Sequence, residues 1–317
     1  MYNLFMKLVI QIPCYNEQEN VLEVLSAIPK NIDGIDEIEI FVINDGSSDK
    51  TSKIARDFGV NVIDIPFKRG LSNAFKVGIN NALKNKADIL VNLDGDNQYD
   101  ARDIEKLIQP ILAGSDMVVG ARPIDKIKTF SPIKKILQKF GSHIVKLVSG
   151  LDIKDAASGF RAFNRNAMLH LNVFNNFTYT IETLIQAKYK NLKVKNVDIN
   201  INEQKNRKSK LFKNNFDYIF KQAKNLIRFF IIYRPARFFS IIASLLFLIG
   251  FILGARFLYF YFFQDGSGHI QSLILCAIIL TMSFIIAMLA IVGDLFSINR
   301  KILEEIRLEI RQNKYKK

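Results

Sequence analysis

Cysteine and tryptophan are scarce in this sequence, which has two cysteines and no tryptophan among 317 residues. Cys14 lies just before a polar motif near the N-terminus, and Cys276 lies inside a long apolar run near the other end. No cysteine spacing typical of a zinc site occurs. A disulfide between the two thiols and a structural zinc site are therefore not expected.

Charge is missing from two long stretches near the C-terminus. Between Phe238 and Phe263 the only ionisable side chain besides tyrosine is Arg256, and residues 273–289 have none. The second apolar run continues to Phe296 with Asp294 alone inside it. Each stretch is long enough to cross a hydrocarbon core of about 30 Å as a helix. We predict two transmembrane helices, over about residues 238–263 and 273–296. The alternative is a pair of buried helices in a soluble protein, which runs above about 18 residues disfavour.

Positive charge exceeds negative charge, with 44 Lys and Arg against 30 Asp and Glu and a formal net charge of +14. Basic residues gather in residues 205–237 and 300–317, on either side of the apolar runs, whereas the connector 264–272 has no Lys or Arg. The positive-inside rule then predicts a multi-pass protein of the cytoplasmic membrane, with the N-terminal domain and the C-terminal tail in the cytoplasm. Basic belts beside membrane spans more simply meet anionic lipid headgroups than nucleic acid, so no nucleic-acid partner is expected.

Apolar strands alternate with helical patterns through the first 200 residues. This alternation indicates βαβ units, and hence an α/β fold with a mostly parallel, Rossmann-like sheet and helices on both faces. Expected strands cover residues 7–12, 38–43, 60–65, 89–93, 117–119 and 194–201. Expected helices begin near Val21 and cover residues 50–58, 71–84, 101–113 and 179–189.

Two further helical patterns are amphipathic. Residues 126–147 are basic and fit an amphipathic helix. Its polar face could simply be solvated, or the helix could form a lid over the acceptor site or lie against the membrane interface. Residues 212–233 are rich in aromatic side chains, as expected of an interfacial helix. The predicted organisation is therefore a cytoplasmic domain (1–211), an amphipathic juxtamembrane helix (212–237), a transmembrane hairpin (238–298) and a basic tail (299–317).

Three of the expected strands end in acidic clusters, which contain Glu17, Asp45, and Asp94 with Asp96. Two carboxylates one residue apart, directly after an apolar strand, suit a divalent cation such as Mg²⁺ or Mn²⁺. Alone, this pair would more often be a polar turn. In open α/β sheets, however, ligands bind outside the carboxyl ends of the strands. Repeated acidic clusters at that edge therefore favour a nucleotide site with a metal.

Five motifs, in order, resemble family-two glycosyltransferases of GT-A fold. They are Ile12-Pro13-Cys14-Tyr15-Asn16-Glu17, Asn44-Asp45-Gly46-Ser47-Ser48-Asp49, Leu93-Asp94-Gly95-Asp96-Asn97-Gln98, Gly120-Ala121-Arg122 and Ser158-Gly159-Phe160-Arg161. Within this family the chain looks like the polyprenyl-phosphate sugar synthases, the branch of dolichol-phosphate mannose synthase, and in particular like members with a two-helix membrane anchor. The resemblance implies that a hexosyl group moves from a nucleotide-diphosphate sugar to a polyprenyl (dolichyl or undecaprenyl) phosphate, with inversion and with a divalent metal. GDP-mannose, UDP-glucose and UDP-N-acetylglucosamine are all compatible donors.

The resemblance also implies roles for individual residues. The metal would be held by Asp94, Asp96 and Gln98, and Arg122 would meet donor phosphate or sugar. Asp155 is a further catalytic candidate, as an acceptor-side or sugar-hydroxyl contact, with a helix cap or a salt bridge to Arg161 as alternatives. The nucleotide-sugar pocket would be lined by Pro13, Tyr15, Glu17, Ile43, Asp45, Asp94, Gly95, Asp96, Gln98 and Arg122.

Two groups of basic residues complete the expected site. The family usually has Arg-x-x-Gly-x-Ser-Lys after its late strand, and this chain has Gln204 at the arginine position and Arg207 at the glycine position. The Ser-Lys end matches, so Lys210 is a candidate phosphate contact, and Arg207 or Lys205 is a candidate substitute for the arginine. The acceptor lipid phosphate would be met by Lys134, Lys135 or Lys139.

Other classes of protein remain as alternatives. A processive polysaccharide synthase usually carries a Gln-x-x-Arg-Trp motif and more spans, and this chain has no tryptophan. A transporter would need a polar pathway, which two spans with few charges offer poorly. An inactive nucleotide-sugar-binding scaffold in the membrane is compatible with the motifs. Homo-oligomerisation through the two spans is also compatible with the sequence.

Overall fold

The structure is a computed structural model of the chain, and it describes residues 5–127, 132–174, 178–202, 224, 227–228, 230–263 and 270–316. The chain divides into two compact units. The first contains Met1–Gln222 together with Ile310–Lys317, and the second contains Ala223–Glu309.

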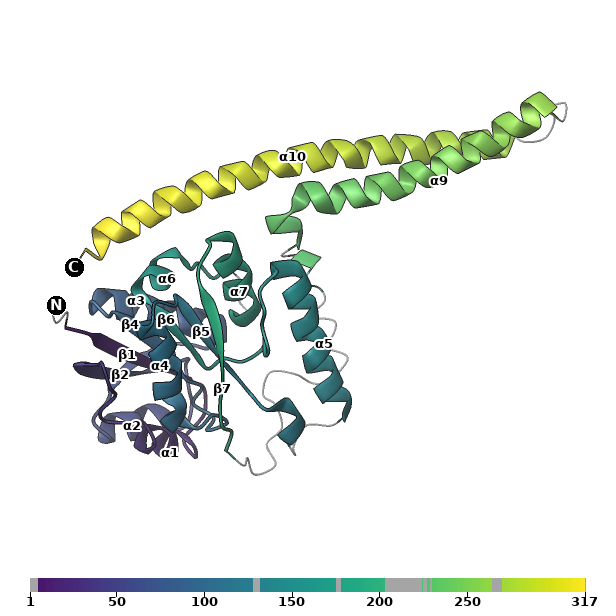
Figure 1. Cartoon of the computed structure of the whole chain (residues 1–317). Helices are drawn as coiled ribbons and strands as arrows, with labels where there is room; N and C mark the ends of the chain where they lie inside the picture. Colours follow the sequence, from purple (N-terminus) through teal and green to yellow (C-terminus); the bar gives the residue numbers. More distant parts are fainter. Residues whose placement is uncertain are drawn as a thin grey trace. The chain divides into compact units, whose positions relative to one another are not determined.

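The first unit is built on a seven-stranded sheet with the strand order β3-β2-β1-β4-β6-β5-β7 (Figure 1). All neighbouring strands run parallel except β6, which is antiparallel to both β4 and β5. The mostly parallel α/β sheet expected from the sequence is confirmed. The strands are β1 (Lys7–Cys14), β2 (Glu37–Asn44), β3 (Asn61–Asp64), β4 (Ile89–Asn92), β5 (Met117–Ala121), β6 (Arg161–Asn164) and β7 (Val194–Asp198).

Helices cover the sheet and bury its central strands, and every residue of β4 and β5 is buried. The apolar faces of the helices pack on the sheet because Val, Ile and Leu recur at helical spacing. In α4, for example, the buried residues include Leu107, Ile108 and Ile111. The helices of the first unit are α1 (Val21–Ser26), α2 (Thr51–Asp57), α3 (Leu71–Lys84), α4 (Ile104–Leu112), α5 (Pro132–Ser149), α6 (Arg165–His170) and α7 (Thr180–Tyr189). Two 3₁₀ turns, η1 (Ala101–Asp103) and η2 (Ile124–Lys126), complete it.

Strand β6 was not among the strands expected from the sequence. Its sequence, Arg-Ala-Phe-Asn, is too short and too polar to show strand periodicity. It is nevertheless buried, because hydrogen bonds from Arg161 satisfy the guanidinium inside the protein. Strand β6 lies between β4 and β5 in the sheet.

The second unit is dominated by two long helices, α9 (Pro235–Phe263) and α10 (Ile270–Lys314), although the last turn of α10 belongs to the first unit. The helices contact each other through small residues. The Cys276 thiol donates to the carbonyl of Gly250 at 3.1 Å, and the Ser283 hydroxyl donates to the carbonyl of Ala243 at 2.8 Å. Small residues at such contacts allow close approach of two helix backbones, as is common in membranes.

The apolar side chains of these two helices face outward. In the most apolar 18-residue window of each helix, only 11% of the window in α9 and 17% of the window in α10 is buried among the described residues. A core helix of a soluble protein would be mostly covered, so this alternative does not suit α9 and α10. Both helices are long and apolar enough to cross a membrane.

Both helices extend beyond the apolar runs from which the spans were predicted. Helix α9 begins at Pro235, inside the expected juxtamembrane segment, because proline suits the first position of a helix. Helix α10 continues past the apolar run through the predicted basic tail to Lys314, since no glycine or proline interrupts that stretch. Within the first unit, Arg311 near its end donates to the carbonyls of Met168, Leu169 and Leu171 at the C-terminus of α6.

Candidate active site

The three acidic clusters lie at one edge of the sheet. Strands β2, β1 and β4 are adjacent and parallel, so their carboxyl ends point the same way. Tyr15 and Glu17 follow β1, Asp45 follows β2, and Asp94 follows β4 by two residues. Pro13 and Ile43 are paired in register near the ends of β1 and β2. The topology therefore brings the expected nucleotide-binding residues of the first three motifs together.

Asp94 lies in the most unusual environment at this edge. Burial, and next the negative charge of Asp96, raise the pKa of Asp94 to about 7, while the positive charge of Arg122 opposes that rise. Among the described residues its buried Oδ1 atom has no hydrogen-bond partner. A buried acceptor without a partner is rare in folded proteins and requires an explanation. A bound cation would provide one.

The donor set around Asp94 fits a magnesium or manganese ion. Asp94 and Asp96 offer carboxylate oxygens and Gln98 offers an amide oxygen, which are ligands that these ions prefer. In the part of the chain that the structure describes, no three His, Cys, Asp or Glu side chains form a closed metal cluster. Two carboxylates and an amide would form an open site, with positions left for phosphate oxygens and water.

The space beside Asp94 is kept open by Gly159. A Cβ atom at this position would lie 2.7 Å and 2.9 Å from the two carboxylate oxygens of Asp94 and 3.0 Å from the hydroxyl of Tyr179. Asn92 donates to the carbonyl of Gly159 at 2.9 Å and to the Tyr179 hydroxyl at 2.8 Å. The Ser-Gly-Phe-Arg motif, for which no role at the metal was predicted, thus forms one wall of the Asp94 site.

Arg122 and Asp155 form a buried ion pair. Nε of Arg122 lies 2.6 Å from Oδ2 of Asp155, and Nη2 lies 3.1 Å from Oδ1. The two side chains are 6% and 1% exposed. Nη1 of Arg122 also donates to Oε1 of Gln98 at 3.4 Å. Asp155 therefore fixes the arginine beside the proposed metal ligands.

The alternative pairing of Asp155 with Arg161 is wrong. The guanidinium of Arg161 donates instead to the carbonyls of Ala156, Ser158 and Thr180. These bonds, together with one to the hydroxyl of Thr183, hold the chain that leads from Asp155 to Gly159 against the start of α7. Burial lowers the pKa of Arg161 to about 10, which still leaves it charged at neutral pH.

Residues 67–70, which were not among the predicted site residues, contact residues of the expected nucleotide pocket. The carboxylate of Asp45 accepts from the backbone N–H groups of Arg69 and Gly70, both at 2.8 Å. Nζ of Lys68 lies 3.8 Å from the centre of the Tyr15 ring. The basic pair directly before α3 was the available signal in the sequence.

The other basic candidates contact Asp125 or lie outside the described residues. Nζ of Lys135 donates to the carbonyl of Asp125 at 2.7 Å, and Lys139 forms an exposed ion pair with the Asp125 carboxylate at 2.7 Å. An exposed ion pair of this kind contributes little to stability, so a phosphate can compete with Asp125 for Lys139. The side chain of Lys134, and residues Lys205, Arg207 and Lys210 entirely, lie outside the described residues.

Divalent cations are expected to stabilise the protein more at pH 8 than at pH 6. The pKa of Asp94 is about 7 in the fold and about 4 in an unfolded chain, so the metal-free fold loses stability as pH rises from 4 through 7. A cation at Asp94 removes that cost, and below pH 7 it must displace a proton. Melting temperatures with Mn²⁺ and with a chelator, at both pH values, would measure the difference. Asp94→Asn should abolish it, whereas an equal shift at both pH values would contradict the role of Asp94.

Comparisons with known proteins agree with this architecture. Residues 9–171, just over half of the chain, match the family described as Glycosyl transferase family 2. A dolichol-phosphate mannosyltransferase from Pyrococcus furiosus is 34% identical over 194 residues, which cover 58% of this chain and 54% of that protein. The chain thus spans about half the length of that relative. A UDP-N-acetylglucosamine–dolichyl-phosphate N-acetylglucosaminyltransferase from Methanococcus voltae is 32% identical over 212 residues, which cover 59% of this chain and 82% of that protein.

A solved structure supports the fold. Glucosyl-3-phosphoglycerate synthase from Mycobacterium tuberculosis, crystallised with Mn²⁺, UDP and glucosyl-3-phosphoglycerate, matches with a TM-score of 0.55 at 17% identity. The match covers 70% of this chain and 77% of that chain, and at this identity it shows the GT-A fold alone. The family match, the relatives and the fold together lead to one conclusion: the chain belongs to glycosyl transferase family 2 and is a glycosyltransferase.

Proposed function

We propose that this glycosyltransferase transfers a hexosyl group from a nucleotide-diphosphate sugar to a polyprenyl phosphate. The observation that carries the proposal is the combination, in one chain, of the acidic edge around Asp94 with two outward-facing apolar helices. A water-soluble acceptor would not require the helices, whereas an acceptor with a long hydrocarbon tail lies in the membrane. The names of the two curated relatives, both of which act on dolichyl phosphate, support this acceptor.

The chemistry of the acceptor reduces what the protein must supply. A lipid monophosphate has, by analogy with phosphorylated side chains, a second pKa of about 6, so it is largely ionised at neutral pH and needs no strong general base. The site must instead bring two anions together and stabilise the departing diphosphate. A divalent ion held by Asp94, Asp96 and Gln98 would supply Lewis-acid stabilisation of that leaving group. A single displacement of this kind inverts the anomeric centre.

Arg122 and the basic residues around the acceptor path have complementary roles in this proposal. Asp155 holds Arg122 in one orientation, so its positive charge is in place before substrate arrives and costs no reorganisation. Lys135 and Lys139, with Lys134, would receive the lipid phosphate in exchange for their contacts with Asp125. Asp45, Tyr15 and Glu17 would face the nucleotide, and Lys210 or Arg207 would close over its phosphates.

The proposed membrane arrangement follows from the distribution of charge. Helices α9 and α10 would form a hairpin through the cytoplasmic membrane, with its connector outside. The catalytic domain and the basic end of α10 would lie in the cytoplasm, because basic residues flank the spans on that side only. The nucleotide sugar, made in the cytoplasm, would then reach the site directly.

The proposal is tested with the purified full chain, Mn²⁺ and polyprenyl phosphate. Labelled GDP-mannose, UDP-glucose and UDP-N-acetylglucosamine are supplied in turn, and label is followed into the organic phase. We expect one donor to yield a glycosyl-lipid, and a chelator to stop its formation. Replacing Lys134, Lys135 and Lys139 by alanine should raise the KM for the lipid at least several-fold. Binding of a donor without transfer or hydrolysis would instead indicate an inactive scaffold.

A further inference from the structure

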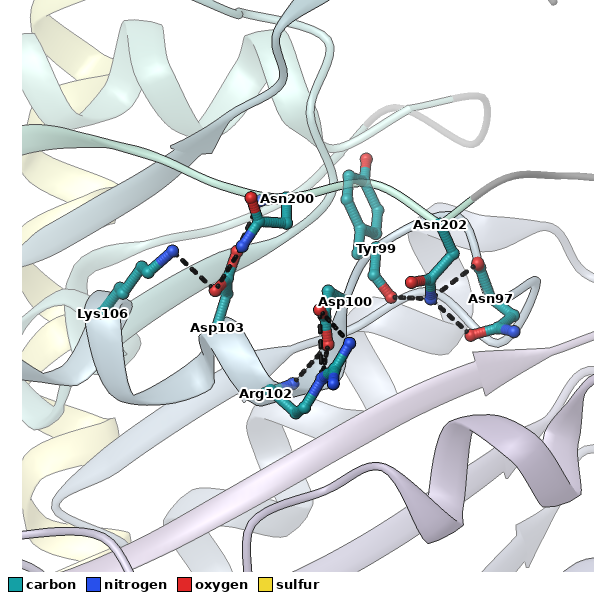
Figure 2. Close-up of polar contacts among 8 residues, drawn as sticks. All are labelled: Asn97, Tyr99, Asp100, Arg102, Asp103, Lys106, Asn200 and Asn202. Atoms are coloured by element: carbon teal, nitrogen blue, oxygen red, sulfur yellow. Dashed lines mark hydrogen bonds and ion pairs between the residues drawn. The ribbon is translucent and has the colours of Figure 1, made fainter.

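The chain that leaves β7 is fastened to the loop that carries the proposed metal ligands. Residues 199–202 run beside this loop, and Ile201 forms an isolated antiparallel bridge with Tyr99. Figure 2 shows Asn202 directed at Asn97 and at the backbone of Tyr99, while Asn200 is directed at Asp103. Two asparagines of one short segment thus make two separate attachments.

Asn202 makes the attachment nearest to the ligands. Its backbone N–H donates to the carbonyl of Gln98 at 3.0 Å. Its side-chain amide donates to Oδ1 of Asn97 at 2.9 Å, to the carbonyl of Asn97 at 3.3 Å and to the carbonyl of Tyr99 at 3.2 Å. One residue therefore meets four acceptors within three consecutive residues of the loop.

The backbone of this part of the loop has an unfavourable conformation, so contacts from outside the loop are needed to stabilise it. Asn97 lies between the proposed ligands Asp96 and Gln98, and its φ of 58° is in the left-handed region, which costs energy for residues other than glycine. The N–H of Gln98 donates to Oδ1 of Asp96 at 3.1 Å, so the turn sets the spacing of the two ligands. Contacts that stabilise the turn also stabilise that spacing.

Asn200 makes a comparable attachment that does not reach the ligands. Its backbone N–H and its side-chain amide both donate to the carboxylate of Asp103, which also forms an ion pair with Lys106 at 2.8 Å. Asp103 belongs to η1, several residues beyond Gln98. Asn200 therefore ties the same segment to the same domain without contacting residues 96–99 through its side chain.

We propose that Asn202 is a positioning residue, which holds Asp96 and Gln98 at the separation that a divalent ion requires. The inference rests on the proposed function, because it assumes that the ion binds these ligands. Groups that orient metal ligands from behind are needed for tight binding, and their loss typically weakens metal affinity by about 10- to 100-fold. The end of β7 would thereby contribute to the metal site without contacting the metal.

The test measures binding of Mn²⁺ alone to the full chain in detergent, from the electron paramagnetic resonance signal of the free ion. Asn202→Ala should weaken binding by about 10- to 100-fold. Asn200→Ala, the matched control, should leave affinity within about threefold of wild type even where it lowers the melting temperature as much. In the transfer assay, excess Mn²⁺ should restore the kcat of Asn202→Ala.

Each other outcome has a defined meaning. Equal Mn²⁺ affinity in wild type and Asn202→Ala, or an equal loss in both asparagine variants, would overturn the positioning role while leaving the proposed function standing. Absence of Mn²⁺ binding to wild type would overturn both. If Asn202→Ala does not fold, Asn202→Leu decides, since it keeps about the size of the side chain, removes the amide donor and adds no charge. Weakened Mn²⁺ binding by this variant supports the proposal, and retained binding overturns it.

Discussion

Asp96→Ala is expected to lower kcat/KM for glycosyl transfer by about a thousandfold while the protein stays folded. A bound divalent ion stabilises transition-state charge by several kcal/mol, which corresponds to about three orders of magnitude in rate. Asp96 lies in the loop after β4, where its Oδ1 accepts from the N–H of Gln98. Removing this side chain takes away a proposed metal ligand and the contact that spaces it from Gln98. Loss of the hydrogen bond to Gln98 costs the fold only about 1 kcal/mol.

The measurement compares glycosyl-lipid formation and melting temperature in wild type, Asp96→Ala and Asp57→Ala. Asp57 is an exposed carboxylate at the end of α2, so its removal controls for the change in net charge. We expect the control to retain wild-type activity. A folded Asp96→Ala variant that forms product at the wild-type rate, with all divalent metal chelated, would exclude Asp96 from metal binding.

Asp155→Ala is expected to reduce both stability and activity. The Arg122–Asp155 pair is almost fully buried, and removing one member of such a pair costs about 3–5 kcal/mol because the other charge is left without compensation. For a unit of this size the melting temperature would fall by roughly 6–20 °C, at about 2–4 °C per kcal/mol. Arg122 would also lose its fixed orientation beside Gln98, and we expect kcat to fall by about 100-fold.

A double variant separates the two effects. Arg122→Met combined with Asp155→Leu removes both charges and fills the space with apolar side chains, which is often neutral or stabilising for a buried pair. It should therefore recover most of the lost melting temperature but none of the lost activity, because no guanidinium remains at the site. Wild-type stability in Asp155→Ala, or full activity in the double variant, would show that the pair does not position Arg122 for the reaction.

Local patterns in the sequence predicted a large part of this protein. Strands β1, β2 and β4 and helix α3 follow from runs and periodicities that are visible within about 15 residues. Because parallel strands end at one edge, the meeting of Glu17, Asp45 and Asp94 was predictable once these strands were recognised. The five motifs predicted the family, and the two long uncharged runs predicted two helices that are apolar enough to cross a membrane.

The partners of the site residues could not be read in this way. The Arg122–Asp155 pair joins residues 33 positions apart, and the contacts of Asn202 with Asn97 join residues 105 positions apart. No local spacing encodes such pairs, because they depend on which strands become neighbours.

The sequence by itself therefore determined the α/β class, the family, the acidic edge and the two apolar helices, since each depends on side chains close together in the chain. Only the tertiary structure decided that β6 lies between β4 and β5, that Asp155 pairs with Arg122 rather than Arg161, and that Asn202 contacts the loop of Asp96. The physical reason is that buried polar groups must find partners wherever the packed chain offers them. Arg161 satisfies its guanidinium with carbonyl groups, so the Asp155 carboxylate is left to pair with Arg122.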